Sequence, residues 1–262
     1  MNNVNNTLYI PLYGKSYVSR RGILLRDPDA EAIWEAEGFA LKGKASSKWL
    51  AYYMSMRAAV FDGWVSRMRQ TYPEAVVLHL GCGMDSRAKR VGTGENLWFD
   101  VDFPEVIAER SRYFRESEHY RMVAADLRSE EWLNVIPRGG TGIVVMEGVS
   151  MYLTPEELNA LLENLKGHFG ELRLLMDCYS TFAAKASRFK NPINEVGVYR
   201  VYGLDDPESI SCLSFRKEWD MTPETLISQL PQGDRRLFRK LYAGTFAGKL
   251  YRMYEFEGRC RT

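Results

Sequence analysis

The sequence lacks an excess of charge of either sign. Lysine and arginine together number 35, aspartate and glutamate together number 34, and the formal net charge is +1. Nucleic-acid-binding proteins usually carry a basic excess, and strongly acidic chains tend to be disordered. We therefore expect no nucleic-acid partner. Hydrophobic residues make up 45% of the 262 residues, which is typical of a globular protein.

The spacings of a metal centre or a disulfide framework are also missing. The three histidines are scattered, and the four cysteines contain no Cys-x-x-Cys pair, so we expect reduced thiols and no metal. The sequence contains no run of about 18 apolar residues, so we expect no membrane-spanning helix. The polar, asparagine-rich residues Met1–Thr7 do not resemble a secretory signal. The prediction is a cytoplasmic protein with no membrane partner; the sequence does not indicate its oligomeric state.

Short apolar runs alternate with helical patterns from residue 75 onward. Strands are predicted at 75–80, 96–101, 120–125, 142–146 and 172–176, with helices at 105–115 and 155–168. Strands separated by helices indicate an α/β fold of parallel β-α-β units with helices on both faces of the sheet. Two further strands are expected at 215–219 and 250–256, and the second alternates as an antiparallel strand would.

The N-terminal part differs from this α/β pattern. Residues 8–26, rich in basic and aromatic side chains, are predicted to be a loop. Helices are predicted at 29–37 and 48–70, where apolar residues recur at helical spacing. These helices would form a cap on one continuous α/β domain.

Each predicted parallel strand is followed by glycines or by an acid. The first strand leads into Gly81-Cys82-Gly83, and later strands end at Asp100-Val101-Asp102, Asp126, Glu147 and Asp177. Ligands of open parallel sheets bind beyond these carboxyl ends. Asp100 and Asp102 follow Gly81 by 19 and 21 residues, close to the spacing at which an acid accepts hydrogen bonds from ribose hydroxyls.

The glycines alone would equally fit a plain strand-to-helix turn. The third glycine of a dinucleotide fingerprint is replaced by Ser86, and the carboxylate of Asp85 would repel a pyrophosphate. The pattern therefore favours a nucleoside without phosphates. A nicotinamide-dependent oxidoreductase of the NAD(P) type remains the alternative.

Several blocks in order resemble the leucine carboxyl methyltransferase family. They include 76–87 (VVLHLGCGMDSR), 98–106 (WFDVDFPEV) and 147–153 (EGVSMYL). Further similar segments are 11–15, 26–28, 125–128 and 203–207. The chain is most similar to the bacterial branch that resembles polyketide O-methyltransferases. The resemblance implies a class I methyltransferase: a Rossmann-like, seven-stranded, mostly parallel sheet with a helical N-terminal cap.

The resemblance also implies S-adenosylmethionine as the cofactor, with S-adenosylhomocysteine as the product, and a role for individual residues. Gly81 and Gly83 would pass beneath the cofactor. Asp102, or alternatively Asp100, would bind the ribose. Asp126 and Leu127 would contact the adenine. At the methionine end, Glu147 would face the amino group, and Arg57 and Lys15 would pair with the carboxylate.

The expected division of the chain follows from these roles. Residues 1–73 would be the helical cap, 74–178 the cofactor-binding core, and 179–262 the substrate-side insertion with the C-terminal strands. Substrate contacts are expected from aromatic and basic residues of the later segments: Tyr152, Tyr179, Arg188, Tyr199 and Arg200, with Arg20 and Arg21 as weaker candidates.

The expected reaction is methyl transfer to an oxygen of a small, planar or polyketide-like acid. A carboxylate is already ionised at neutral pH and needs no general base, whereas a hydroxyl does. The histidine near a strand end, His79, is expected to point into the sheet, which favours a carboxylate acceptor. Methyl transfer requires no obligatory catalytic side chain, so a non-catalytic cofactor-binding protein is a further alternative.

Overall fold

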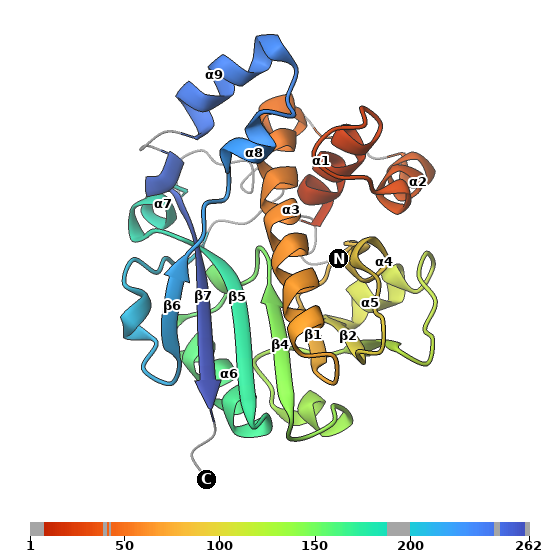
Figure 1. Cartoon of the computed structure of the whole chain (residues 1–262), viewed down its shortest axis with the longest axis vertical. Coiled ribbons are helices and arrows are strands. Elements are labelled where there is room, and N and C mark those ends of the chain that lie inside the picture. Colours follow the sequence, from red (N-terminus) through yellow and green to blue (C-terminus); the bar gives the residue numbers. More distant parts are fainter. Residues whose placement is uncertain (1–7, 39–40, 42, 188–199, 244–246, 260–262) are drawn as a thin grey trace.

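Seven strands form one mixed sheet in the order β3-β2-β1-β4-β5-β7-β6 (Figure 1). The computed structural model describes residues 8–38, 41, 43–187, 200–243 and 247–259. The strands are β1 (Val76–Leu80), β2 (Trp98–Asp102), β3 (Tyr120–Ala124), β4 (Thr141–Met146), β5 (Glu171–Tyr179), β6 (Ser214–Glu218) and β7 (Tyr251–Arg259). Strands β1 to β5 pair in parallel, and β7 pairs antiparallel with both β5 and β6. The predicted seven-stranded, mostly parallel sheet is confirmed.

The helices cover both faces of this sheet (Figure 1). They are α1 (Tyr9–Ser19), α2 (Pro28–Glu37), α3 (Lys48–Thr71), α4 (Arg87–Val91), α5 (Pro104–Arg110), α6 (Pro155–His168), α7 (Thr181–Ala186), α8 (Glu224–Ile227) and α9 (Gln232–Tyr242). Short 3-10 helices are η2 (Gly43–Ser46), η3 (Glu131–Val135), η4 (Ser150–Tyr152), η6 (Pro207–Ser209) and η7 (Ala247–Lys249). Among the described segments, no helix is long and apolar enough to cross a membrane.

Two apolar cores lie on opposite faces of the sheet because successive side chains of a strand alternate in direction. Val77 belongs to the core shared with Trp64 of α3, whereas Leu78 belongs to the core shared with Leu165 of α6. Every residue of β1 is buried. This explains why the central strands are continuous apolar runs rather than alternating ones.

The segment 8–26 contains a helix, so its prediction as a loop was wrong. α1 begins at Tyr9, and Pro11 is tolerated because the first N–H groups of a helix have no intrahelical acceptor. Gly14 lets α1 lie close to α3: a Cβ there would be 3.3 Å from the carbonyl oxygen of Ala51. Tertiary packing, which the local pattern does not reveal, stabilises this helix.

The fifth strand is longer than predicted. The sequence placed its end at Asp177, but β5 continues to Tyr179 because β7 pairs with it over its full length, up to the pair Tyr179–Tyr251. Since β7 runs in the opposite direction, its first residue lies at the edge where the parallel strands end. This reversal places a C-terminal segment beside the strand ends.

A pair of glycine-to-alanine changes tests the packing of β4. A Cβ at Gly142 would lie 2.6 Å from Cδ2 of the Phe169 ring, so Gly142→Ala should overpack the core and lower the free energy of unfolding by about 1–3 kcal/mol. Gly63 is exposed on α3, and a Cβ there meets no described atom within 4 Å. Gly63→Ala should therefore stabilise by roughly 0.5–1 kcal/mol. Urea unfolding measures both, and equal effects would contradict the packing.

Candidate active site

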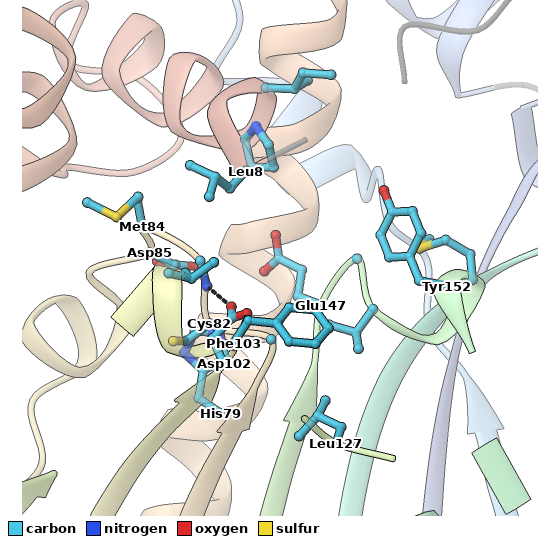
Figure 2. A pocket seen from close by; sticks show the side chains of 18 of the residues that line it. Leu8, His79, Cys82, Met84, Asp85, Asp102, Phe103, Leu127, Glu147 and Tyr152 are labelled. Atoms are coloured by element: carbon cyan, nitrogen blue, oxygen red, sulfur yellow. Dashed lines mark hydrogen bonds between the residues drawn. The ribbon is translucent and has the colours of Figure 1, made fainter. Parts of the chain in front are cut away.

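A cavity of about 280 Å³ lies along the carboxyl ends of the parallel strands (Figure 2). Its lining follows the sheet from Asp126 and Leu127 after β3, through Asp102 of β2, Gly81 and Gly83 after β1 and Glu147 after β4, to Tyr251 at the start of β7. α1 and α3 also line it, with Lys15 and Arg57 among their residues. The cavity therefore brings together eight of the nine residues predicted to bind a cofactor.

The glycine turn after β1 depends on a backbone that other residues rarely adopt. Gly81 and Gly83 have φ angles of +63° and +51°, and a Cβ on Gly81 would overlap the side chain of Val149. A Cβ on Gly83 would lie 3.4 Å from Cβ of Leu8 at the start of α1. Because glycine has no Cβ, the backbone of this turn borders the cavity without a side chain in between.

Asp102 is held against this turn by two backbone groups. Its Oδ2 accepts a hydrogen bond from the Gly83 N–H at 2.7 Å, and its Oδ1 accepts one from the Phe103 N–H at 2.8 Å. Burial raises the pKa of Asp102 above its ordinary value. Each carboxylate oxygen has a second lone pair, so Asp102 can still accept hydrogen bonds from a ligand in the cavity.

Asp100 does not line the cavity, so the structure does not support it as the alternative ribose ligand. It is fully buried, where it pairs with Arg110 and accepts hydrogen bonds from the Tyr120 hydroxyl at 2.6 Å and the Trp98 indole at 2.8 Å. Burial disfavours its charge, but Arg110 and the hydrogen bonds outweigh this and lower the pKa of Asp100 to about 2. Its partners on other elements are Arg110 of α5, Tyr120 of β3 and His79 of β1, so its carboxylate links β2 to its neighbours.

Glu147 lies between two arginines in the middle of the cavity. Arg57 donates from Nε to Oε1 at 3.1 Å, and Arg87 pairs with Oε2. Arg57 also donates from Nη1 to Asp177 at 2.9 Å. Burial disfavours the Glu147 charge, but the two guanidinium groups outweigh this and lower the pKa of Glu147 to about 2. Glu147 is therefore ionised at neutral pH, as recognition of a ligand ammonium group requires.

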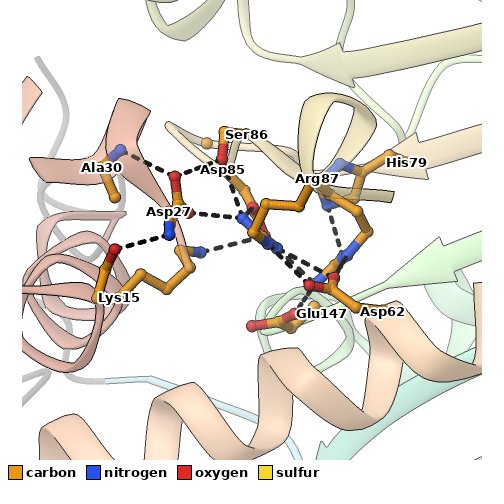
Figure 3. A network of polar contacts seen from close by, with 12 residues as sticks. Lys15, Asp27, Ala30, Asp62, His79, Asp85, Ser86, Arg87 and Glu147 are labelled. Carbon is orange, nitrogen blue, oxygen red and sulfur yellow. Dashed lines mark hydrogen bonds and ion pairs between the residues drawn. The ribbon is translucent and has the colours of Figure 1, made fainter. Parts of the chain in front are cut away.

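The cap and the glycine turn are joined by ion pairs around Asp85 (Figure 3). Asp85 pairs with Lys15 of α1 at 3.1 Å, with Arg87 at 3.2 Å and with Arg90 at 2.6 Å. Although burial disfavours its charge, these cations hold the pKa of Asp85 well below its usual range. The sequence suggested that Asp85 would repel a phosphate; the structure shows this charge compensated.

Asp27 extends the same network to α2. Its Oδ1 accepts from the Ala30 N–H at 2.9 Å, which caps the helix, and from the Ser86 hydroxyl at 2.6 Å. Its Oδ2 pairs with Arg90 at 2.7 Å. One buried carboxylate thereby ties the start of α2 to the start of α4.

His79 lines the floor of the cavity, a correction to the prediction that it points only into the sheet. Nε2 lies 3.1 Å from Nη1 of Arg87, and Nδ1 lies 3.1 Å from Oδ1 of Asp100. An arginine can only donate, so Nε2 must accept and the ring proton must be on Nδ1. Both ring nitrogens of His79 therefore have partners within the protein.

Comparison with known proteins identifies the family. The sequence profile described as leucine carboxyl methyltransferase matches residues 13–166, more than half of the chain. The chain belongs to the leucine carboxyl methyltransferase family. The resemblance stated from the sequence motifs is thus confirmed.

Two relatives are similar to this chain in sequence. The tetracenomycin polyketide synthesis O-methyltransferase TcmP of Streptomyces glaucescens is 32% identical over 173 residues, which cover 64% of each chain. The S-adenosyl-L-methionine-dependent methyltransferase dpfgK of Gibberella zeae is 28% identical over 183 residues, covering 64% of this chain and 61% of that protein. The matches thus span less than two thirds of the relatives' own length.

Solved structures agree on the fold. Magnesium protoporphyrin IX methyltransferase from Synechocystis PCC 6803, with bound S-adenosylhomocysteine, superposes with a TM-score of 0.53 at 12% identity, covering 87% of this chain and 93% of that one. A structure from Thermobifida fusca gives a TM-score of 0.57 at 13% identity, covering 95% and 94%. The predicted class I methyltransferase fold is confirmed.

The structure places only some of the residues that were predicted to contact a substrate at the cavity. Tyr152 lines the cavity. Tyr179 lies behind the lining, with its ring against Tyr251 at 4.5 Å between centroids. Arg200 is exposed, 5.3 Å from the ring of Tyr202, and does not line the cavity. Arg188 and Tyr199 lie outside the described residues.

Arg20 and Arg21, the weaker candidates, lie on the surface. Arg20 pairs with Glu35 at 3.4 Å, and Arg21 lies 3.6 Å over the ring of Tyr17. Asp126, in contrast, is at the cavity and accepts from the backbone N–H of Arg128 at 3.0 Å.

Some cavity residues had no role assigned from the sequence. Met54, Phe103, Met151 and Tyr251 line the cavity as well. Tyr251 is far from the family blocks in sequence, and only the pairing of β7 with β5 brings it there. Its position as the first residue of an alternating strand after a long insertion was the one available signal.

Asp100 should matter for stability rather than for ligand binding. Asp100→Asn leaves the buried Arg110 guanidinium without its carboxylate, so the free energy of unfolding should fall by about 3–5 kcal/mol at pH 7. Because the folded-state pKa is depressed, the wild-type contribution is complete above about pH 5 and is lost as the pH falls toward 2. Urea unfolding from pH 7 downward should show the difference narrowing only below about pH 5.

The matched control is Asp29→Asn, which removes an exposed pair with Lys89. That variant should lose less than about 1 kcal/mol. A similar loss in both variants would show that burial of Asp100 is not the cause.

Proposed function

We propose that this chain is an S-adenosylmethionine-dependent O-methyltransferase that methylates an ionised oxygen, a carboxylate in particular, of a small, planar aromatic acid. The observation that carries the proposal is the placement of two acids, Asp102 and Glu147, on either side of a glycine turn in one cavity. Such spacing suits a ligand that has vicinal hydroxyls at one end and an ammonium group at the other.

The residues present fit this cofactor. Asp102, fixed by two backbone N–H groups, would accept hydrogen bonds from the ribose hydroxyls. Glu147, ionised between two arginines, would accept from the methionine ammonium group. The guanidinium of Arg57 has five N–H donors, so its bonds to Glu147 and Asp177 leave donors for the methionine carboxylate, with Lys15 close by.

At the other end of the cavity, Leu127 and Asp126 would contact the adenine. Leu127 supplies an apolar surface, and Asp126 can accept from the exocyclic amino group. The two residues after β3 would thus complete a binding site for both the ribose and the adenine.

The carboxylate acceptor follows from the state of the cavity's proton acceptors. Among the described lining residues, the carboxylates of Asp85, Asp126 and Glu147 pair with cations. Asp102 accepts from two backbone N–H groups, and both nitrogens of His79 have partners within the protein. An acceptor that is already ionised needs no base. Bound S-adenosylmethionine would supply the methyl group, and no proton would have to leave the acceptor oxygen.

Relatives support the substrate class. TcmP, by its name, is an O-methyltransferase of polyketide synthesis, and methionine and tyrosine side chains line this chain's cavity beyond Glu147. A flat aromatic molecule suits such walls. We also propose that the chain divides into a cap, a cofactor-binding core and a substrate-side segment. Its partner would be a small molecule.

Ligand-induced stabilisation separates this function from that of an NAD(P)-dependent oxidoreductase. S-adenosylhomocysteine at 100 times its dissociation constant should stabilise the folded state by about 2.7 kcal/mol, which raises the melting temperature. NADH and NADPH should produce no shift at the same concentration. The measurement is a thermal-shift titration, and a shift with NADH but not with S-adenosylhomocysteine would overturn the proposal.

Asp102→Asn should weaken S-adenosylhomocysteine binding at least about tenfold, because two hydrogen bonds from ribose to a charged acceptor are lost or weakened. The variant retains an oxygen for the Gly83 N–H but places its amide NH2 beside the Phe103 N–H, so thermal unfolding of the variant has to be measured alongside. Glu95→Gln, an exposed acid just before β2, is the control and should bind normally. Calorimetric titration measures both, and an unchanged affinity for Asp102→Asn would remove Asp102 from the ribose site.

Transfer of a labelled methyl group to a panel of aromatic carboxylic acids tests catalysis itself. We expect product esters that release methanol on alkaline hydrolysis. Tight S-adenosylhomocysteine binding without transfer to any acid in the panel would favour the non-catalytic alternative.

A further inference from the structure

Asp177, near the end of β5, is a buried acid that contacts two cavity residues without lining the cavity itself. Its Oδ2 accepts a hydrogen bond from Nη1 of Arg57 at 2.9 Å, and its Oδ1 accepts one from the Gly148 N–H at 2.6 Å. Arg57 belongs to α3, and Gly148 is the first residue after Glu147. One carboxylate thus joins α3 to the turn after β4.

The turn after β4 is held to Asp177 at a second point. The Ser150 hydroxyl donates to the carbonyl oxygen of Asp177. Gly148 also lies against the guanidinium group of Arg57: its φ angle is +71°, and a Cβ there would be 3.4 Å from both Nη1 and Nη2. The turn, Asp177 and Arg57 therefore pack as one unit beside Glu147.

Two acids fix the orientation of the Arg57 guanidinium group. Its Nε and Nη2 lie 3.1 Å and 3.0 Å from Oε1 of Glu147, and its Nη1 donates to Asp177. A guanidinium group is planar, with its N–H donors in fixed directions. Contacts at Nε and at both terminal nitrogens set its plane and its rotation, and with them the directions of its other N–H bonds.

Asp177 supplies contacts that Glu147 does not. Glu147 already compensates the charge of Arg57, and a second buried acid has a desolvation cost: burial raises the pKa of Asp177 despite the neighbouring Arg57. What Asp177 adds is geometric, namely one bond to Nη1 and one to the backbone N–H of Gly148. These two bonds fix Arg57 relative to the turn that carries Glu147.

We propose that Asp177 is a positioning residue, which holds Arg57 and the turn after Glu147 in the geometry that binds the amino-acid end of S-adenosylmethionine. The inference rests on the proposed function, in which Glu147 binds the ammonium group and Arg57 binds the carboxylate. Asp177 touches neither group of the cofactor and acts through the two residues that do. Binding to groups that are already fixed loses less conformational entropy than binding to mobile ones.

The test compares two ligands that share the adenosine part and the sulfur atom. S-adenosylhomocysteine also carries the amino and carboxylate groups, whereas 5′-methylthioadenosine lacks both. Asp177→Asn keeps the size of the side chain, but its NH2 group would face either Arg57 or the Gly148 N–H, both of which are donors.

We expect Asp177→Asn to bind S-adenosylhomocysteine about tenfold more weakly than the wild type. Its affinity for 5′-methylthioadenosine should stay within about twofold, because that ligand has no group for Arg57 or Glu147 to bind. Calorimetric titration of the full chain measures both affinities. A merely structural role would change both alike, so the ratio of the two dissociation constants is the readout.

Asp100→Asn is the matched control. It is the same change at an equally buried acid, whose partner Arg110 does not line the cavity. Loosening of the fold should weaken both ligands to a similar extent, so the ratio of their dissociation constants should remain that of the wild type.

Asp177→Glu keeps a negative charge beside Arg57, and it keeps the inference testable if Asp177→Asn fails to fold. Its carboxylate is displaced by one methylene group. A role limited to charge compensation predicts wild-type binding of S-adenosylhomocysteine by this variant. We expect instead that it binds S-adenosylhomocysteine at least about threefold more weakly, with 5′-methylthioadenosine little changed.

Three results would overturn the inference. They are wild-type affinity for S-adenosylhomocysteine in either Asp177 variant, equal weakening of both ligands in these variants, and the same preferential loss in Asp100→Asn. Failure of the wild type to bind S-adenosylhomocysteine is a different result, because it contradicts the proposed function itself.

Discussion

The pairing of buried charges is the constraint on which the rest of the structure depends. Glu147, Asp85 and Asp177 lie beneath helices and strand ends, where an unpaired ionised group would cost several kcal/mol. Arg57 and Arg87 compensate them and come from different parts of the chain, α3 and α4. The cap, the glycine turn and the central strands must therefore meet in one arrangement for any of these charges to be stable.

This constraint also shapes the cavity. An acid that is held ionised by two guanidinium groups presents a fixed negative charge without needing to be deprotonated first. Both ring nitrogens of His79 likewise have partners within the protein. The acids of the cavity thus carry charges that ion pairs and backbone hydrogen bonds hold in place.

Much of the fold could be predicted from the sequence, because the central strands are buried on both faces and appear as apolar runs. The carboxyl ends of parallel strands meet at one edge of a sheet, so the sequence predicts that Asp102 and Glu147 lie at the same edge. The predictions that were wrong concerned features that depend on tertiary contacts. α1 forms because Gly14 allows it to lie against α3, and local composition does not contain that information.

The choice between Asp100 and Asp102 shows the same limit. Their spacings from Gly81 differ by only two residues, and both side chains are acids on one strand. The structure separates them through Arg110 and Tyr120, which surround Asp100 alone. Tyr251 was missed because its place beside Tyr179 depends on a pairing between segments more than 70 residues apart in sequence.

The reversed direction of β7 has a consequence for where the walls of the cavity come from in the sequence. The family profile ends at residue 166, so the lining residues at the ends of the parallel strands lie within it and Tyr251 lies outside it. Because an antiparallel strand brings its beginning to the edge where the parallel strands finish, a late stretch of the chain reaches the same cavity. One strand pairing thus adds to the shared part of the cavity a wall that the family profile does not include.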